Sequence, residues 1–142
     1  MKEADVCAAL TKALRAALPG SDVWKVHDVS TKGRPDIVVT WHGFTTWLEV
    51  KLLRKGDSVE GCAKASPLQH RTMVQLQKQT YGRAWYVIYD LRDPKDKATF
   101  LFRPTDVLAG QLYATHVGHG FNHALIAEWI ERTHDEDYRE AA

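Results

Sequence analysis

The stretch Arg34–Lys51, RPDIVVTWHGFTTWLEVK, decides the fold of this 142-residue chain. Two runs rich in β-branched and aromatic residues flank His42-Gly43, which is typical of a β-hairpin with a two-residue turn. If Gly43 takes a positive φ there, pairing proceeds outward from the turn and brings Asp36 directly across from Glu49. Because side chains alternate between the faces of a strand, Lys51 then lies on the same face as the two acids.

Two ionised carboxylates about 5 Å apart repel by roughly 3 kcal/mol at an effective dielectric constant of 20. An ion pair of Glu49 with Lys51 at the surface would explain Glu49-Val50-Lys51 alone. A turn into the strand would explain Pro35-Asp36 alone. Both acids and the lysine on one face favour a site for a hard divalent cation instead, because Mg²⁺ prefers carboxylate, water and phosphate oxygens as ligands. We therefore expect Asp36 and Glu49 to bind Mg²⁺ and Lys51 to lie beside a bound phosphate.

Pro35-Asp36 followed by Glu49-Val50-Lys51 resembles the PD-(D/E)xK nuclease signature. Ser30-Thr31-Lys32-Gly33 is similar to the approach loop of archaeal-type Holliday-junction resolvases, and Ser66-Pro67-Leu68-Gln69 resembles the virus-type replication-repair nuclease domains of the same superfamily. The resemblance covers roughly residues 1–91. It implies a restriction-endonuclease-like fold and metal-dependent DNA cleavage that leaves a 5′-phosphate and a 3′-hydroxyl.

The same resemblance implies roles for three further residues. The carbonyl of Val50 would add a metal ligand, and Glu3 on the first helix would contribute to the metal site. Asp5 competes with Glu3 for that role, and attraction of an acid to the helix dipole would also explain Glu3. Gln69, early in a later helix, would orient water or phosphate and so belongs with Asp36, Glu49 and Lys51 among the catalytic candidates.

The chain length predicts a single α/β domain, and the resemblance implies a mixed β-sheet that has the catalytic hairpin at its centre and helices on its flanks. We expect a core over about residues 1–103, a helical addition over about 104–134 and a frayed tail over 135–142. The expected helices are 3–18, 67–80, 104–112 and 121–133, the other strands are 23–27, 84–91 and 98–102, and the segment 52–61 is expected to be a mobile loop.

Charge is uneven along the chain although the net charge is only +1. Basic residues dominate from Lys51 to Arg83 and acidic residues from Glu128 to Glu140. The basic half suits a phosphate backbone, although a solvated surface would show the same bias. The candidate DNA-binding residues are Ser30, Thr31, Lys32, Arg34, Arg54, Lys55, Lys64 and Arg71.

Cysteine and histidine give weaker signals. Cys7 and Cys62 lie far apart and form no Cys-x-x-Cys motif, so inert thiols in a reducing compartment are expected. His116, His119 and His123 could ligate zinc, but they lack a fourth ligand at a standard spacing, and loop and cap positions explain them better. We expect no membrane segment and, from the start of the chain, an intracellular protein; the resemblance implies a bacterial or archaeal cytoplasm or a phage gene.

Together these features predict a Mg²⁺-dependent endonuclease, with Mn²⁺ able to substitute. Branched DNA such as a Holliday junction is the expected substrate, and a homodimer would make the two cuts, with Tyr113, Phe121 and Trp129 as candidate interface residues. A repair or restriction-like nuclease acting on flaps, ends or duplex DNA is the alternative. A DNA-binding module whose catalytic site has lapsed is a third interpretation.

Overall fold

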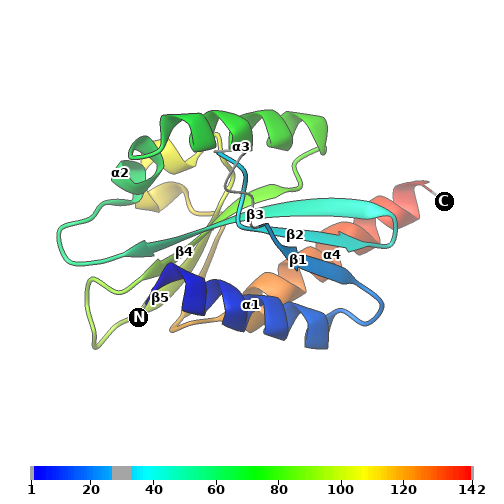
Figure 1. The fold of residues 1–142 in the computed structure, drawn as a ribbon, viewed down its shortest axis with the longest axis horizontal. Helices are drawn as coiled ribbons and strands as arrows, with labels where there is room; N and C mark the ends of the chain where they lie inside the picture. Colours follow the sequence, from blue (N-terminus) through cyan, green and yellow to red (C-terminus); the bar gives the residue numbers. More distant parts are fainter. Residues whose placement is uncertain (1, 27–32, 142) are drawn as a thin grey trace.

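A computed structural model of the chain describes residues 2–26 and 33–141. Its centre is a six-stranded sheet in which the strands lie in sequence order (Figure 1). All neighbouring strands run antiparallel except the central pair β3 and β4, which run parallel. The predicted mixed sheet, with the β2–β3 hairpin next to its centre, is confirmed. The strands are β1 (Asp22–Lys25), β2 (Ile37–Trp41), β3 (Phe44–Leu53), β4 (Ala84–Asp90), β5 (Ala98–Phe102) and β6 (His116–His119).

Helices cover both faces of the sheet (Figure 1). One face carries α1 (Glu3–Ala17) and α4 (His123–Ala141), and the other carries α2 (Val59–Lys64) and α3 (Pro67–Gln79). The predicted first helix is confirmed, because Leu10 and Leu14 recur on its inner stripe and are fully buried. The predicted start of α3 is also confirmed: Pro67 occupies the first turn, where a missing N–H costs no hydrogen bond.

Alternation along β3 decides which side chains face which helical layer. Leu48 and Val50 pack in the apolar cluster under α1 and α4, whereas Leu53 packs in the cluster under α2 and α3. Glu49 and Lys51 therefore point toward the layer of α2 and α3. The parallel pairing of β3 with β4 requires a crossover, and α2 and α3 form it, so the same connection that builds the sheet also covers the two charged residues.

The expected mobile loop over residues 52–61 is wrong. The strand β3 continues through Leu53, which is fully buried and pairs with Asp90. After a short turn, Ser58 caps α2, and its Oγ accepts a hydrogen bond from the N–H of Gly61 at 3.0 Å. Burial of the two leucines after Lys51 therefore extends the strand, and a side-chain cap begins the next helix early.

The expected helix over residues 104–112 is also wrong. Two 3₁₀ turns, η1 (Val107–Ala109) and η2 (Gln111–Tyr113), take its place, and Gly110 with a φ of 100° separates them. The chain then forms β6, which pairs antiparallel with β5 at the edge of the sheet. The segment 104–134 is thus not simply a helical addition, because it supplies the sixth strand.

The last helix, α4, continues to Ala141, over the residues expected to form a frayed tail. His134 explains why the helix passes the expected end at Thr133. It is fully buried, its Nε2 lies 2.6 Å from Thr46 Oγ1, and its Nδ1 lies 2.9 Å from the carbonyl of Trp41. In the described part of the chain, no helix combines the length and the apolar character needed to cross a membrane.

Candidate active site

The β2–β3 hairpin has the predicted register. Trp41 pairs with Phe44, and the pairing continues outward to Ile37 and Leu48. His42 and Gly43 both take positive φ values, 52° and 80°, as a tight two-residue hairpin turn requires. Regular pairing ends at Ile37, so Asp36 lies just outside the strand and meets Glu49 through side-chain contacts instead of a cross-strand backbone pair.

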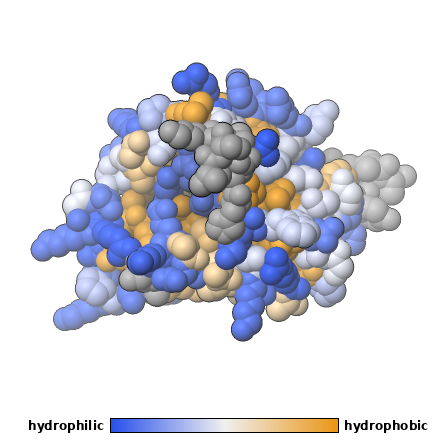
Figure 2. All heavy atoms as spheres, in the orientation of Figure 1, coloured by the Kyte–Doolittle hydropathy of each residue, from blue (hydrophilic) through white to orange (hydrophobic). Residues whose placement is uncertain are grey.

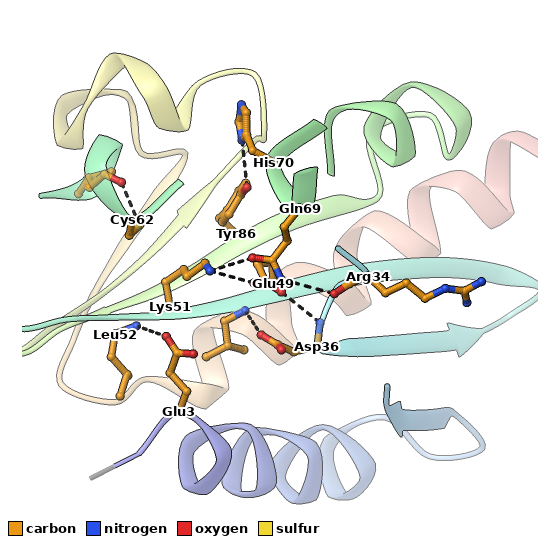
Figure 3. Close-up of polar contacts among 12 residues, drawn as sticks. Glu3, Arg34, Asp36, Glu49, Lys51, Leu52, Cys62, Gln69, His70 and Tyr86 are labelled. Atoms are coloured by element: carbon orange, nitrogen blue, oxygen red, sulfur yellow. Dashed lines mark hydrogen bonds and ion pairs between the residues drawn. The ribbon is translucent and has the colours of Figure 1, made fainter. Parts of the chain in front are cut away.

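Hydrogen bonds connect the Asp36 segment to the Glu49 segment at this end of the hairpin (Figure 3). The N–H of Asp36 donates to Glu49 Oε1 at 3.2 Å, and Asp36 Oδ2 accepts the N–H of Val50 at 2.9 Å. Pro35, which has no N–H to donate, precedes the pair and is buried. Carboxylate oxygens thus accept the backbone N–H groups where the pairing of β2 with β3 ends. The two carboxylates therefore lie side by side.

Burial dominates the electrostatics of Glu49, which is 1% exposed. Loss of solvation raises the pKa of this carboxyl to about 9, with the negative charge of Asp36 as the next cause. Lys51 opposes the shift, since its Nζ lies 3.2 Å from Glu49 Oε2. Without another cation the Glu49 carboxyl therefore keeps its proton at neutral pH, and a divalent ion at the pair would favour its release.

Lys51 connects the acids to α3. Its Nζ donates to Gln69 Oε1 at 2.8 Å, and Gln69 Nε2 in turn reaches the carbonyl of Arg34 at 3.5 Å. Gln69 lies in the first turn of α3, as predicted. The structure therefore brings the four catalytic candidates together, from β3, α3 and the residue before β2 (Figure 3).

Gly33 allows the chain before Asp36 to lie against the start of α3. It has a φ of 91°, and a Cβ atom there would come within 2.9 Å of Leu68 Cγ. A larger residue would be strained at this φ and would require the Leu68 side chain to move. Ser30, Thr31 and Lys32, which precede it, lie outside the described residues.

Glu3 lies near the site without joining the carboxylate pair. Its Oε1 accepts the N–H of Leu52 at 3.4 Å, along the same edge of β3 where Asp36 accepts the N–H of Val50. Asp5 instead accepts the backbone N–H of Lys2 at 3.3 Å, at the start of α1. Within residues 2–26 and 33–141, no three His, Cys, Asp or Glu side chains gather in a group able to hold a metal. The role of Glu3 at the metal site therefore stays a prediction.

The remaining DNA-binding candidates are surface residues. Arg34, Arg54, Lys55, Lys64 and Arg71 are all exposed. They come from the segment before β2, the turn after β3, the end of α2 and the second turn of α3. Hydrophilic side chains cover most of the face seen in Figure 2, and hydrophobic ones show between the upper and lower helical layers.

Two residues near the acids, Tyr86 and His70, carried almost no sequence signal. Tyr86 on β4 pairs in register with Glu49, is 1% exposed, and places its hydroxyl 2.9 Å from His70 Nδ1. Burial raises the pKa of Tyr86 above its ordinary value, and Glu49 adds to the shift. The parallel register of β3 and β4 joins distant segments, so no local spacing could have identified this contact. The adjacency of His70 to Gln69 was the one available indication.

The three C-terminal histidines have separate neighbours. The ring of His116 lies 4.3 Å from that of Trp129, His119 Nδ1 lies 3.8 Å from Asp96 Oδ1, and His123 Nδ1 lies 2.9 Å from the hydroxyl of Tyr89. His116 and His119 belong to β6, and His123 begins α4. None of the three thus occupies the loop or cap position expected for it, because two are strand residues and the cap of α4 is Asn122, whose Oδ1 accepts the N–H of Leu125 at 2.9 Å.

Both cysteines are free thiols. Burial raises the pKa of Cys7 to about 12 and that of Cys62 to about 11, so both stay protonated at neutral pH. Low reactivity follows from this, in agreement with the expectation from their spacing.

No family model and no curated protein matches this chain. Among solved structures, the chain is similar to Hjc of Archaeoglobus fulgidus, a Holliday junction resolvase from an archaeal hyperthermophile. The sequence identity is 18%, the TM-score is 0.48, and the match covers 74% of this chain and 75% of the other. At that identity the likeness concerns the fold, and the chemistry of the site depends on the residues of this chain.

Proposed function

We propose that this chain is a metal-dependent DNA endonuclease that hydrolyses phosphodiester bonds at the Asp36–Glu49 pair. The observation that supports this most directly is the buried Glu49 carboxyl held against a second acid, with Lys51 as its cationic neighbour. Two acids and a lysine in such an arrangement stabilise a fold poorly, because their desolvation costs about as much as their attraction gains. Buried ionisable groups with shifted pKa values and a charged partner cluster at functional sites.

The donor set fits Mg²⁺, with Mn²⁺ as a substitute. Asp36 and Glu49 would hold the ion through hard carboxylate oxygens, with the carbonyl of Val50 as a further ligand. A bound ion would supply an activated water nucleophile and charge stabilisation at the leaving oxygen. The raised pKa of Glu49 supports this assignment, because a nearby cation would favour the ionised form of a carboxyl that burial otherwise keeps neutral.

The chain's own residues would position the scissile phosphate. Lys51, through its ammonium group, would bind a non-bridging oxygen and offset the negative charge that develops during cleavage. Gln69 holds Lys51 Nζ and is itself within 3.5 Å of the Arg34 carbonyl, so it would fix the direction of that ammonium group. Glu3 accepts the N–H of Leu52 on the edge of β3 where Asp36 accepts that of Val50, so it would help to orient a ligand that Asp36 and Glu49 hold.

Branched DNA is the substrate we propose first, on the resemblance of Ser30 to Gly33 and of the PD-(D/E)xK motif to the resolvases. Two symmetric cuts in a junction require two sites, so the proposal includes a homodimer. The alternative substrates are flaps, ends and duplex DNA, for which a single site would suffice.

Side-by-side digestion of a synthetic four-way junction, a flap and a linear duplex, each with Mg²⁺ or with EDTA, tests this proposal. Preferential, Mg²⁺-dependent cleavage of the junction is the expected result. Cleavage of the flap or duplex at an equal rate would favour a repair or restriction-like nuclease. Binding of all three without cleavage would favour the lapsed module.

A further inference from the structure

A cavity of about 560 Å³ lies beside α3, where α3 meets the end of α2 and the 3₁₀ turn η1. Its volume is within the range of small-molecule sites. Most of the surface that it exposes is apolar, and the apolar lining residues are Ala63, Pro67, Val74 and Leu108. Ala63 is buried, whereas Leu108 is 42% exposed, so the cavity is open to solvent at the η1 side.

Three cations lie around this apolar surface: Lys64, Arg71 and Lys78. All three are exposed, and no carboxylate lines the cavity. Within the part of the chain that the structure describes, no ion pair involves any of them. Arg71 and Lys78 lie two turns apart on α3, about 10 Å along its axis. An anion would therefore find positive charge along the length of the cavity.

The cavity shares the first turn of α3 with the candidate active site. Gln69 accepts the hydrogen bond from Lys51, and the next residue, His70, lines the cavity. His70 is fixed by the hydroxyl of Tyr86, which pairs in register with Glu49. The candidate active site and the cavity thus both contact the first turn of α3, through Gln69 and His70 respectively.

We propose that this cavity binds one unpaired nucleotide of the DNA strand next to the cleaved bond. The base would lie against the apolar lining, and its phosphates would contact Lys64, Arg71 and Lys78. A nucleotide fits because it combines an apolar ring face with adjacent negative charge, which is the combination that the lining presents. A base within a duplex cannot enter a cavity, so the nucleotide must be unpaired. This inference rests on the proposed function and deepens it, since it assigns a preference for DNA with a single-stranded segment.

Fluorescence anisotropy with the full chain in EDTA tests the proposal by binding alone. The probes are a labelled duplex with a single-stranded tail and the blunt duplex of the same sequence. The wild type is expected to bind the tailed probe about tenfold more tightly. Val74→Trp, which places a bulky ring in the cavity, and Lys78→Glu, which reverses one charge, are both expected to abolish that preference. Lys12→Glu, an equal charge change at an exposed position of α1, should retain it.

Equal binding of the two probes by the wild type would overturn the proposal, as would a tail preference that survives in both cavity variants. An acidic peptide rich in glutamate serves as a second labelled probe. If both variants lose the peptide and keep the tail preference, the cavity is a groove for a protein segment. Because no metal is present, these outcomes are independent of cleavage: a protein that cleaves DNA but shows no tail preference retains the proposed function and loses this inference.

Discussion

The backbone N–H of Asp36 lies 3.2 Å from Oε1 of Glu49 and joins the two acids at the open end of the β2–β3 hairpin. Because Glu49 is almost fully buried, this contact keeps its carboxyl in a place where the ionised form is poorly solvated. The site is therefore under electrostatic strain until a proton or a metal ion compensates the charge.

Neutralising Glu49 should stabilise the metal-free protein. The folded-state pKa of about 9 exceeds the ordinary value of 4.5, so between these values the unfolded chain releases a proton that the native protein keeps. Stability contributed by Glu49 is thus complete below pH 4.5 and falls as the pH rises toward 9. Glu49→Gln should melt above the wild type at pH 8 in EDTA, by a margin that shrinks toward pH 5.

Glu128→Gln is the matched control, because Glu128 is exposed on α4. Its melting temperature should follow that of the wild type at every pH. A Glu49→Gln protein that melts clearly below the wild type at pH 8 would show that the carboxylate is a favourable structural contact instead.

Metal binding should raise the melting temperature of the wild type. An ion that binds only the native state stabilises it by mass action, which amounts to about 2.7 kcal/mol at a hundredfold excess over Kd. Asp36→Asn and Glu49→Gln each remove a charged ligand, so their melting temperatures should respond much less to Mg²⁺ or Mn²⁺. Differential scanning fluorimetry across a metal titration measures this. Equal responses in all three proteins would place the ion elsewhere.

Gln69 and Glu3 should contribute less to cleavage than the hairpin residues. Gln69→Ala removes the acceptor that holds Lys51 Nζ, and a loss of about tenfold in kcat is expected with KM little changed. Glu3→Gln keeps an oxygen that can accept the N–H of Leu52, so near-normal kcat is expected across a Mg²⁺ titration. Steady-state kinetics on one DNA substrate checks both. A large loss in Glu3→Gln would return Glu3 to the metal site.

The proposed dimer should form through the edge that η2 and β6 make. Phe121 and Trp129 pack inward, with ring centroids 5.3 Å from Tyr89 and 5.4 Å from Trp85, so they are poor interface candidates. Tyr113 is 59% exposed and Leu112 is 97% exposed. Exposed apolar residues at a strand edge are typical of contact surfaces.

Light scattering at high protein concentration tests the dimer. The wild type should have twice the monomer mass, and Leu112→Asp should be monomeric. Tyr81→Asp, at another highly exposed site, should remain dimeric. A monomeric wild type, with and without junction DNA, would remove the dimer from the proposal.

Local signals were sufficient for the elements that carry the site. The His42-Gly43 turn fixes the hairpin register, and Ser66-Pro67 begins α3 at the residue that brings Gln69 toward Lys51. Elements that depend on distant contacts were not predictable in this way. The strand β6 has a sequence of only four residues, two of them histidine and one glycine, and it forms because β5 offers an open edge.

The same reasoning explains the other differences. Tyr86 lies beside Glu49 only because β3 and β4 pair in parallel, a register that no local pattern specifies. Asp36 was expected in a regular cross-strand pair, but β2 starts at Ile37. At Asp36, hydrogen bonds between carboxylates and backbone N–H groups replace the strand pairing. The extension of α4 depends on His134 reaching Thr46 and the Trp41 carbonyl, which are far away in sequence.

Nicking of supercoiled plasmid tests the central claim most directly. The wild type should convert plasmid to open-circle or linear DNA with Mg²⁺ and not with EDTA. Asp36→Asn, Glu49→Gln and Lys51→Ala should each lower the rate by about 100-fold or more while their affinity for DNA in EDTA stays near that of the wild type. Nicking that persists in EDTA, or near-normal cleavage by any of these three variants, would contradict a metal-dependent site built on Asp36, Glu49 and Lys51.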